Sequence, residues 1–211
     1  MERLLPVASE TFALLVPVKS LDSAKTRLRL DDATTRRLMV AFTRDAVTAA
    51  RRSPLVGAVH LVTGERALAE RLGVSLLPDE GAGDLNRALA AAAARVTARD
   101  PATGLAVMCA DLPCLVEDDL TAALAAAPSP RWCVTDTEGT GTTLLVARAG
   151  EDLAPAFGPA SASHHVRSGA TAVPDALVTL RHDVDTPADL ERAVGLGLGE
   201  HTARALAARA S

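Results

Sequence analysis

Carboxylate side chains come directly after two apolar runs of the sequence. Asp111 follows Ala106–Ala110, and Asp183 and Asp185 stand at the end of a second run near the C-terminus. An unpaired carboxylate at the end of a buried strand is costly, so such a group is usually paired, caps a backbone or binds a cation. If these acids converge, they supply the one or two carboxylates that Mg²⁺ takes beside substrate phosphates. The alternatives are turn chemistry in Asp-Leu-Pro for Asp111, and an N-cap before Pro187 for the second group.

Basic side chains cluster after the first apolar run, Phe12–Val18. Lys19, Lys25, Arg27 and Arg29 stand against a single acidic residue there, in a chain whose net charge is -4. Parallel sheets bind ligands at the carboxyl ends of their strands, so the cluster predicts a site for a polyanion. A solvated basic loop is the alternative interpretation.

Two further segments combine glycines with hydroxyl side chains. The first is Gly139–Thr143, and the second is Phe157–Ser161, where Ser161 can cap a helix that carries His164 and His165. Glycines allow close backbone approach, hydroxyls donate hydrogen bonds, and a helix start presents N–H groups. Together these segments suit a second, smaller anion. The alternatives are an ordinary hairpin turn and an ordinary cap, and the two histidines are expected to be packing or surface residues.

A glycine loop at residues 79–84 precedes Leu85 and Asn86. The amide of Asn86 has both donors and an acceptor, so it could bind a base or a ribose. A single glycine loop does not by itself specify a ligand.

The elements that must position these residues alternate between strand-like and helical patterns, which is typical of βαβ units and a mainly parallel sheet. Strands are expected over these ranges: 12–18, 59–63, 74–77, 105–110, 132–136, 142–148 and 177–184. Helices are expected from Asp31 or Asp32 to about Ala49, over 65–72, from an Asp84 cap to about Ala98, over 117–127, from Ser161 to about Ser168, and twice at the C-terminus. The strands at 132–136 and 142–148 are expected to form an antiparallel pair.

Length and composition exclude several classes of protein. A chain of 211 residues is expected to form a single domain, residues 1–211, and its 48% hydrophobic content excludes disorder. No apolar run approaches the ~18 residues that span a bilayer, and the N-terminus carries no export signal, so we expect a cytoplasmic protein without a membrane partner. The acidic balance and an aromatic content of 2% argue against nucleic acid as a partner. The three cysteines are expected to be reduced thiols of the core.

The separate segments together resemble the CofC-type guanylyltransferases, within the MobA-like nucleotidyltransferases. The resemblance spans about residues 12 to 190. It rests on these motifs: Val16-Pro17-Val18-Lys19, Ala24-Lys25-x-Arg27-Leu28, Leu85-Asn86-x-Ala88-Leu89, Ala110-Asp111-Leu112-Pro113, Gly139-Thr140-Gly141-Thr142-Thr143, Phe157-Gly158-x2-Ser161-x2-His164 and Asp183-Val184-Asp185-Thr186. Asp-Leu-Pro is common to the wider class, whereas the glycine-threonine and Phe-Gly-x-x-Ser motifs are more specific to this branch.

The resemblance implies a Rossmann-like, three-layer αβα nucleotidyltransferase fold with a mainly parallel, mixed central sheet. It also implies an enzyme of coenzyme F-420 biosynthesis that joins GMP from GTP to a phosphorylated three-carbon acid and releases pyrophosphate. Bacterial members are similar to phosphoenolpyruvate guanylyltransferases, and archaeal members to enzymes that use 2-phospho-L-lactate. The product is a reactive mixed anhydride, so hand-off to a downstream deazaflavin transferase is a further expectation.

By the family pattern, three groups of residues bind the metal ion, the phosphorylated acid and the nucleotide. Asp111 and Asp183 hold Mg²⁺, with Asp185 as a further candidate. The phosphorylated acid is bound by Thr143, Gly158 and Ser161, and the nucleotide by Pro17, Lys19, Lys25 and Asn86, with Lys25 also counted as catalytic. This chain departs from the wider class in two places, because its first loop is not glycine-rich and Asp84 stands where glycine is expected before Leu85.

Phosphoryl-type transfer needs positioning and charge neutralisation rather than a nucleophilic side chain, and the sequence contains no Ser-His-Asp motif. Two other functions stay open at this point. One is a sugar-nucleotide glycosyltransferase, with Asp183 and Asp185 as its Asp-x-Asp motif. The other is a nucleotide-binding module without catalysis, which would need neither paired metal-binding acids nor a second anion site.

Overall fold

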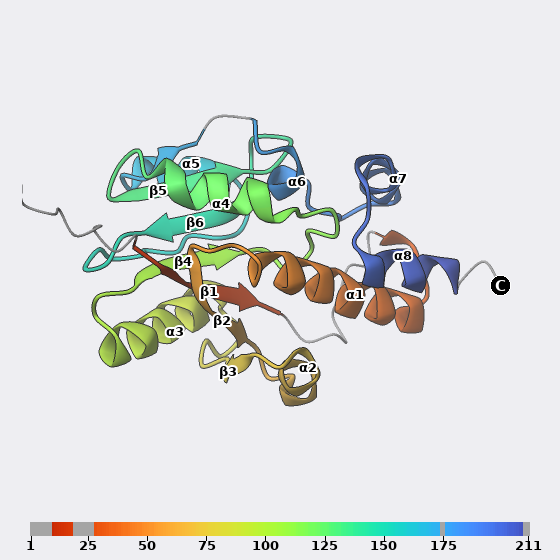
Figure 1. Ribbon diagram of the computed structural model, residues 1–211, viewed down its shortest axis with the longest axis horizontal. Helices are drawn as coiled ribbons and strands as arrows, with labels where there is room; N and C mark the ends of the chain where they lie inside the picture. The colour runs from red at the N-terminus through yellow and green to blue at the C-terminus, as the bar shows by residue number, and fades with distance from the viewer. Residues whose placement is uncertain (1–9, 19–27, 174–175, 209–211) are drawn as a thin grey trace, which may run out of the picture.

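The computed structural model describes residues 10–18, 28–173 and 176–208. Within these ranges the strands are β1 (Phe12–Pro17), β2 (Val56–Val62), β3 (Ser75–Leu77), β4 (Gly104–Met108), β5 (Arg131–Thr135), β6 (Thr142–Ala147) and β7 (Thr171–Ala172). They form one sheet in the order β3-β2-β1-β4-β6-β5-β7 (Figure 1). β6 is antiparallel to both of its neighbours and every other pair is parallel, so the predicted mixed, mainly parallel sheet is confirmed.

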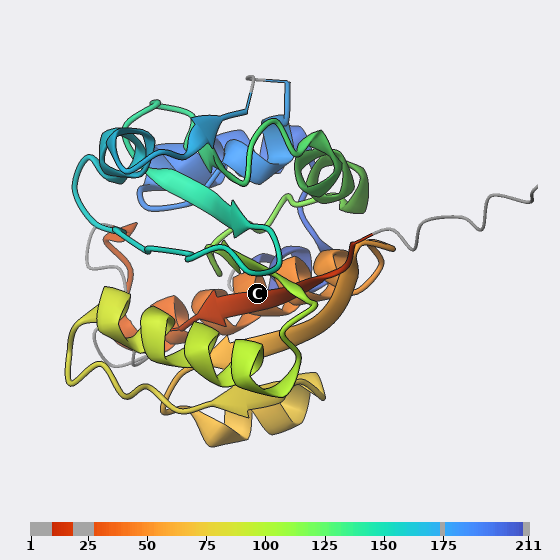
Figure 2. The same ribbon diagram turned by 90° about the vertical axis from the view of Figure 1, so that its left-hand side faces the viewer.

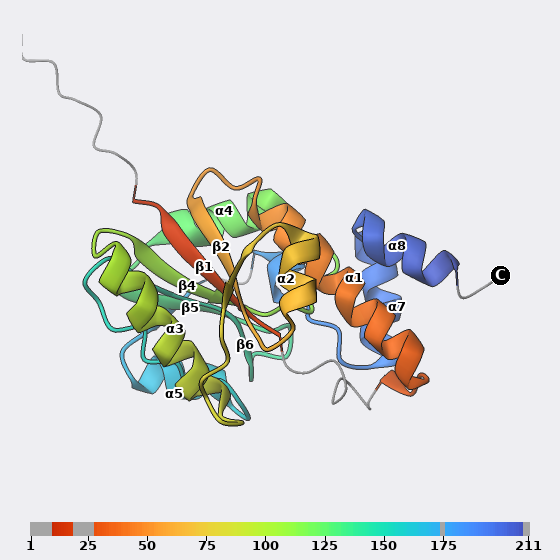
Figure 3. The ribbon, with the colours of Figure 1, turned by 90° about the horizontal axis from the view of Figure 1, so that it is seen from below.

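Helices cover both faces of this sheet and make the predicted three layers. In the described part of the chain they are α1 (Asp32–Ala50), α2 (Arg66–Leu72), α3 (Leu85–Arg99), α4 (Glu117–Ala126), α5 (Ser161–Arg167), α6 (Val178–Arg181), α7 (Pro187–Leu196) and α8 (Glu200–Ala207). Figure 3 shows α3 and α5 on one side of the strands and α1 and α4 on the other.

Alternation along β1 divides the core into two parts. Leu14 and Val16 contribute to the cluster under α1, α2, α4 and α6, whereas Ala13 and Leu15 contribute to the cluster under α3. Successive side chains of a strand point to opposite faces, so a nearly continuous apolar run is what a strand with helices on both faces requires. Figure 2 shows β1 in the middle of the molecule, with α3 across one face.

Short-range signals set the ends of the helices in the first half of the chain. The carboxylate of Asp31 accepts the Thr34 N–H at 2.9 Å, and the carboxylate of Asp84 accepts the N–H groups of Asn86 and Arg87. α2 ends at Gly73, whose φ of 61° suits glycine best because a Cβ is strained there. These caps confirm the predicted helix starts.

The predicted last strand, 177–184, is wrong. Val178–Arg181 form the short helix α6, and residues 182–186 continue without regular structure. Leu177, Leu180 and Val184 are buried with a spacing of three and four residues, which is a helical spacing rather than a strand alternation. The strand beside β5 is instead β7, which is too short to leave a pattern in the sequence.

The two predicted C-terminal helices are present as α7 and α8. α8 is capped from outside, because the buried carboxylate of Asp45 in α1 accepts the N–H groups of His201 at 3.0 Å and Thr202 at 2.8 Å. A Cβ at Gly199 would lie 2.2 Å from the Asp45 carboxyl carbon, so glycine is required for this approach. None of the described helices has the length and apolarity that crossing a bilayer demands.

The cysteines fit the prediction of reduced core thiols. Cys114 and Cys133 are buried, Cys109 is half-buried, and all three are free thiols. Burial, with a contribution from Asp45, raises the pKa of Cys114 to about 11, so its thiol stays protonated.

Candidate functional site

The carboxyl ends of β1 and β4 lie next to each other in the middle of the sheet. β1 pairs in parallel with β2 on one side and with β4 on the other. The helix after β1 and the helix before β4 cover opposite faces, which is the arrangement that opens a ligand crevice in α/β sheets. Pro17 ends β1 at this edge, and half-buried Asp111 stands three residues after the end of β4.

The segment that carries Asp183 lies beside Asp111. The backbone N–H of Val184 donates to the Asp111 carbonyl at 3.0 Å. Asp183 is half-buried and Val184 is fully buried, so the segment is packed rather than loosely attached. The structure therefore brings the two predicted metal-binding segments together without the predicted strand.

Arg181 fixes this segment to the end of β5. Its guanidinium donates to the carbonyls of Thr135 at 3.1 Å and Asp136 at 2.8 Å, and its own carbonyl accepts the Thr137 N–H at 3.0 Å. Sequence analysis missed Arg181, because its partners are backbone groups about 45 residues away and no local pattern marks them.

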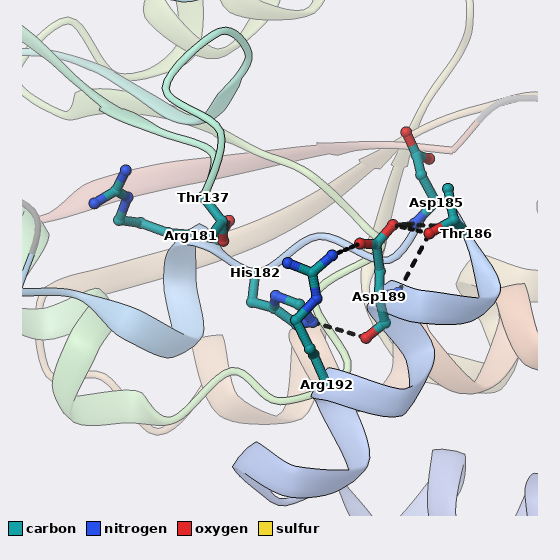
Figure 4. Close-up of polar contacts among 7 residues, drawn as sticks. All are labelled: Thr137, Arg181, His182, Asp185, Thr186, Asp189 and Arg192. Atoms are coloured by element: carbon teal, nitrogen blue, oxygen red, sulfur yellow. Dashed lines mark hydrogen bonds and ion pairs between the residues drawn. The ribbon is translucent and has the colours of Figure 1, made fainter.

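A capping box follows the Asp183 segment at the start of α7. The Thr186 hydroxyl and the Asp189 carboxylate hold each other's backbone N–H groups, and Pro187 occupies the first turn. Figure 4 shows Asp189 bonded to Thr186 and Arg192, while the Asp185 side chain projects away from α7. Burial raises the pKa of Asp189, but the hydrogen bonds from Thr186 outweigh it and leave the pKa below its usual value. The N-cap alternative is thus confirmed for Thr186.

A small polar cavity of about 100 Å³ opens next to these residues. Its lining combines five carboxylates with two basic residues and two threonines: Asp136, Glu138, Asp183, Asp185, Asp189, His182, Arg192, Thr137 and Thr186. The acidity of this lining favours cations over anions.

The glycine-threonine loop lies at the same edge because β6 is antiparallel. β6 starts where β4 and β5 end, so the Thr143 carbonyl accepts the N–H of Cys109, two residues before Asp111, at 2.9 Å. The Asp136 carboxylate accepts the N–H groups of Thr140 at 2.9 Å and Gly141 at 2.7 Å. A Cβ at Gly141 would lie 2.4 Å from that carboxylate, so the turn requires glycine.

The second hydroxyl segment is attached to this loop. The N–H of Ala162 donates to the Thr140 carbonyl at 3.1 Å, which joins the first turn of α5 to the glycine-threonine loop. Ser161 is not the cap that was expected, because the N-cap is Ala160 and Ser161 is the first helical residue. Thr143 and Ser161 are buried and Gly158 is exposed.

Asn86 connects the start of α3 to the segment that carries Phe157 and Gly158. Its amide Nδ2 donates to the Phe157 carbonyl at 2.9 Å, and its Oδ1 accepts the Phe157 N–H at 2.7 Å. Asn86 is the second residue of α3 and follows the glycine loop, where Gly81 packs so closely that a Cβ would lie 2.0 Å from the Asp84 carbonyl. Among the described residues, Phe157 engages only one N–H and one lone pair of the Asn86 amide, so a second N–H and a second lone pair can face a ligand.

The predicted site residues thus divide into two sets. The first set belongs to segments that the hydrogen bonds above join at the carboxyl end of the sheet: Asn86, Asp111, Thr143, Gly158, Ser161, Asp183 and Asp185. Pro17 ends β1 at the same end of the sheet, through the parallel pairing of β1 with β4. Lys19 and Lys25 lie outside the described residues. His165, expected to be a packing or surface residue, is fully buried and bonded to two of these segments.

Comparison with known proteins gives a consistent result. A family model described as guanylyl transferase CofC like matches residues 12–207. The phosphoenolpyruvate guanylyltransferase of Nocardia farcinica is 48% identical over 89% of this chain and 87% of its own length. The protein of the same name from Geodermatophilus obscurus is 47% identical over 95% of this chain and 96% of its own length.

Solved structures agree on the fold. A 4-diphosphocytidyl-2C-methyl-D-erythritol synthase aligns with a TM-score of 0.59 at 13% identity, over 89% of this chain and 98% of that chain. A cytidylyltransferase from Leptospira borgpetersenii aligns with a TM-score of 0.57 at 15% identity, over 94% and 93%. At such identities the similarity concerns the fold alone, and it confirms the predicted nucleotidyltransferase architecture.

Proposed function

Because this chain belongs to the guanylyl transferase CofC-like family, we propose that it transfers GMP from GTP to phosphoenolpyruvate and releases pyrophosphate. The product is enolpyruvoyl-2-diphospho-5′-guanosine, an intermediate for coenzyme F-420. The relatives at 47–48% identity that carry the name phosphoenolpyruvate guanylyltransferase support this substrate pair. The single observation that carries the proposal is the Val184–Asp111 hydrogen bond, which places two carboxylate segments side by side at the β1–β4 edge.

The proposed residue roles are those of the family pattern. Asp111 and Asp183 would hold Mg²⁺, with Asp185 as a further candidate. Thr143, Gly158 and Ser161 would bind the phosphorylated acid. The nucleotide would be held by Pro17, Lys19, Lys25 and Asn86, where Asn86 uses the N–H and lone pair that Phe157 leaves available.

The residues fit Mg²⁺ by their donor type. In the described part of the chain no three His, Cys, Asp or Glu side chains are grouped to hold a metal ion. Mg²⁺ is commonly bound through one or two carboxylates plus substrate phosphates and water, and Asp111 and Asp183 provide that number of hard oxygen ligands. When bound, the ion would supply charge neutralisation between two polyanionic substrates.

The reaction itself needs no covalent step on the protein. A phosphate oxygen of phosphoenolpyruvate attacks the α-phosphorus of GTP in line, and a new phosphorus–oxygen bond forms. The bond from the α-phosphorus to the bridging oxygen of the β-phosphate breaks, and its electron pair leaves with pyrophosphate. The chain's own task is to align the two substrates and to shield their charges, which is how phosphoryl transfer is generally catalysed.

The experiment is pyrophosphate release by the purified protein with Mg²⁺ and GTP. Its acceptor arms are phosphoenolpyruvate, 2-phospho-L-lactate and no acceptor, and its nucleotide controls are ATP and CTP. We expect release only with GTP and phosphoenolpyruvate, and loss of release when the divalent cation is chelated. Release with 2-phospho-L-lactate alone would move the substrate to that acid. Silence in every arm, repeated with the downstream deazaflavin transferase and its acceptor present, would contradict the proposal.

A further inference from the structure

The segment that carries Gly158 has a strained backbone. Ala154 and Ala160 have φ values of 42° and 56°, and Gly158 has a φ of 135°. Side chains with a Cβ pay a steric cost in this region, so such a conformation persists only when the surroundings hold it in place. Two side chains, His165 and Asn86, hold this segment from two sides.

His165 lies under the segment and is fully buried. Its Nε2 accepts the backbone N–H of Ala156 at 2.9 Å, and its Nδ1 lies 2.9 Å from the Thr142 hydroxyl. Because the Ala156 N–H can only donate, Nε2 carries no proton, and Nδ1 must carry it and donate to Thr142. The Phe157 ring meets the imidazole edge-on, with ring centroids 5.1 Å apart.

This arrangement requires the neutral imidazole. Burial, with smaller contributions from the charges of Arg131 and His164, lowers the pKa of His165 to about 4. A protonated ring would have a hydrogen on Nε2 and could no longer accept from Ala156. The single tautomer is therefore retained at neutral pH.

Asn86 holds the same segment from α3. Its amide pairs with both the N–H and the carbonyl of Phe157, as a neighbouring strand would. Phe157 is thus fixed on its backbone by Asn86 and on its ring by His165, and Gly158 follows it directly.

We propose that His165 is a positioning residue for the phosphorylated acid, acting by holding the 156–161 segment against Thr142 and the start of β6. This inference rests on the proposed function, which assigns Thr143, Gly158 and Ser161 to that acid. His165 makes no contact with substrate in this proposal. It sets the relative positions of the two segments whose residues do.

The experiment compares Michaelis constants for phosphoenolpyruvate and GTP in three variants. His165→Leu removes both hydrogen bonds, Thr142→Val removes one, and His165→Gln keeps an amide oxygen as acceptor for Ala156. We expect KM for phosphoenolpyruvate to rise about 10-fold or more in His165→Leu, because both hydrogen bonds that hold the segment are lost, with KM for GTP within about 3-fold of wild type. Thr142→Val should show a smaller rise, and His165→Gln should recover most of the affinity.

A double-mutant cycle and a control separate positioning from general destabilisation. His165→Leu combined with Thr142→Val should be no worse than His165→Leu alone, because both changes break one linkage. The control is Leu68→Ala, which creates a cavity under α2. It should lower stability and leave both KM values unchanged.

The outcomes are distinguishable. An active wild type with unchanged phosphoenolpyruvate KM in His165→Leu, or with equal rises for both substrates, overturns the positioning role and leaves the proposed function intact. If His165→Leu does not fold, the ratio of the two KM values in Thr142→Val decides alone, and an unchanged ratio overturns the role. A wild type without acid-dependent release overturns the proposed function and this inference with it.

Discussion

The two halves of the sheet are held together by different kinds of contact. In β3-β2-β1-β4, parallel strands alternate with helices whose ends are set by residues two or three positions away, such as Asp31 and Asp84. In β6-β5-β7, the connecting segments are held by side chains far away in the sequence, such as Asn86 for Phe157 and Arg181 for Thr135. The first half therefore serves as a scaffold. In the second half, long-range tertiary contacts fix the segments that connect the strands.

The difference shows that the two halves contribute different parts of the proposed site. Positive φ at non-glycine residues occurs in both halves: among the described residues, Arg29 and Ala82 lie in the first half, and Ala127, Ala154 and Ala160 lie in the second. Residues of the proposed acid site lie in this half, whereas the Pro17 end of β1 belongs to the first. Local signals were enough to build the scaffold, but the loops need several long-range partners at once.

The largest effect on catalysis is expected from Asp111 and Asp183, which lie where the two halves of the sheet meet. Asp111→Asn and Asp183→Asn should each lower kcat on the order of 1000-fold, the equivalent of ~4 kcal/mol of lost transition-state stabilisation. Neither should change the melting temperature by more than a few degrees. Pyrophosphate release under saturating GTP and phosphoenolpyruvate measures this. Either variant turning over at the wild-type rate would refute the assignment of that carboxylate.

Acid should lower the stability of the protein through His165, which lies in the second half of the sheet. The pKa of His165 is about 4 in the folded protein and 6.5 ordinarily, so the unfolded chain binds a proton that the folded chain rejects between these values. Stability is full above pH 6.5 and decreases as pH falls toward 4, by about 3 kcal/mol in total for this group. Urea unfolding at pH 7 and pH 4.5 should show a smaller acid loss in His165→Leu than in wild type. Equal losses in the two proteins would contradict the buried neutral state.

Arg181→Met tests the anchoring of the Asp183 segment. It leaves the Thr135 and Asp136 carbonyls without their donor, so we expect a loss of about 2–3 kcal/mol in unfolding free energy and a lower kcat. The matched control is Arg192→Met, since the exposed Arg192–Asp189 ion pair should contribute less than ~0.5 kcal/mol. Denaturant unfolding and pyrophosphate release measure both variants, and equal effects would mean that Arg181 has no special role.

Asp84→Ala should have a smaller and purely local effect in the scaffold half. It removes one N-cap of α3, which costs about 1 kcal/mol, and Asn86 stays on the same helix. Thermal unfolding should show this loss with KM for phosphoenolpyruvate unchanged. A large rise in that KM would show instead that the cap also orients Asn86 toward Phe157.

Ala160→Gly, in the second half of the sheet, should stabilise the protein, with the smallest effect of these variants. Glycine relieves the positive φ at the N-cap of α5, so we expect a gain of about 0.5–1 kcal/mol in unfolding free energy. Ala162→Gly, inside the same helix, is the matched control and should lose about 1 kcal/mol. Denaturant unfolding of the pair measures the difference, and a loss in both variants would argue against strain at residue 160.

The sequence by itself determined the scaffold and the positions of the chemistry. The apolar run of β1, the caps at Asp31 and Asp84, and Asp111 after β4 are all short-range signals, because strand alternation and helix capping act within a few residues. The motifs also identified the glycine-threonine loop and the Phe157–Ser161 segment. These features required no knowledge of distant partners.

Only the tertiary structure decided how the second half closes. The expected strand at 177–184 became α6 and an irregular segment, since burial of Leu177, Leu180 and Val184 against the core outweighed the local preference for strand. The joining of Val184 to Asp111, of Asn86 to Phe157 and of His165 to Ala156 depends on groups many residues apart or on tautomers set by burial. Such contacts have no periodic signature in a sequence, because a hydrogen bond between distant segments exists only after the sheet has brought them together.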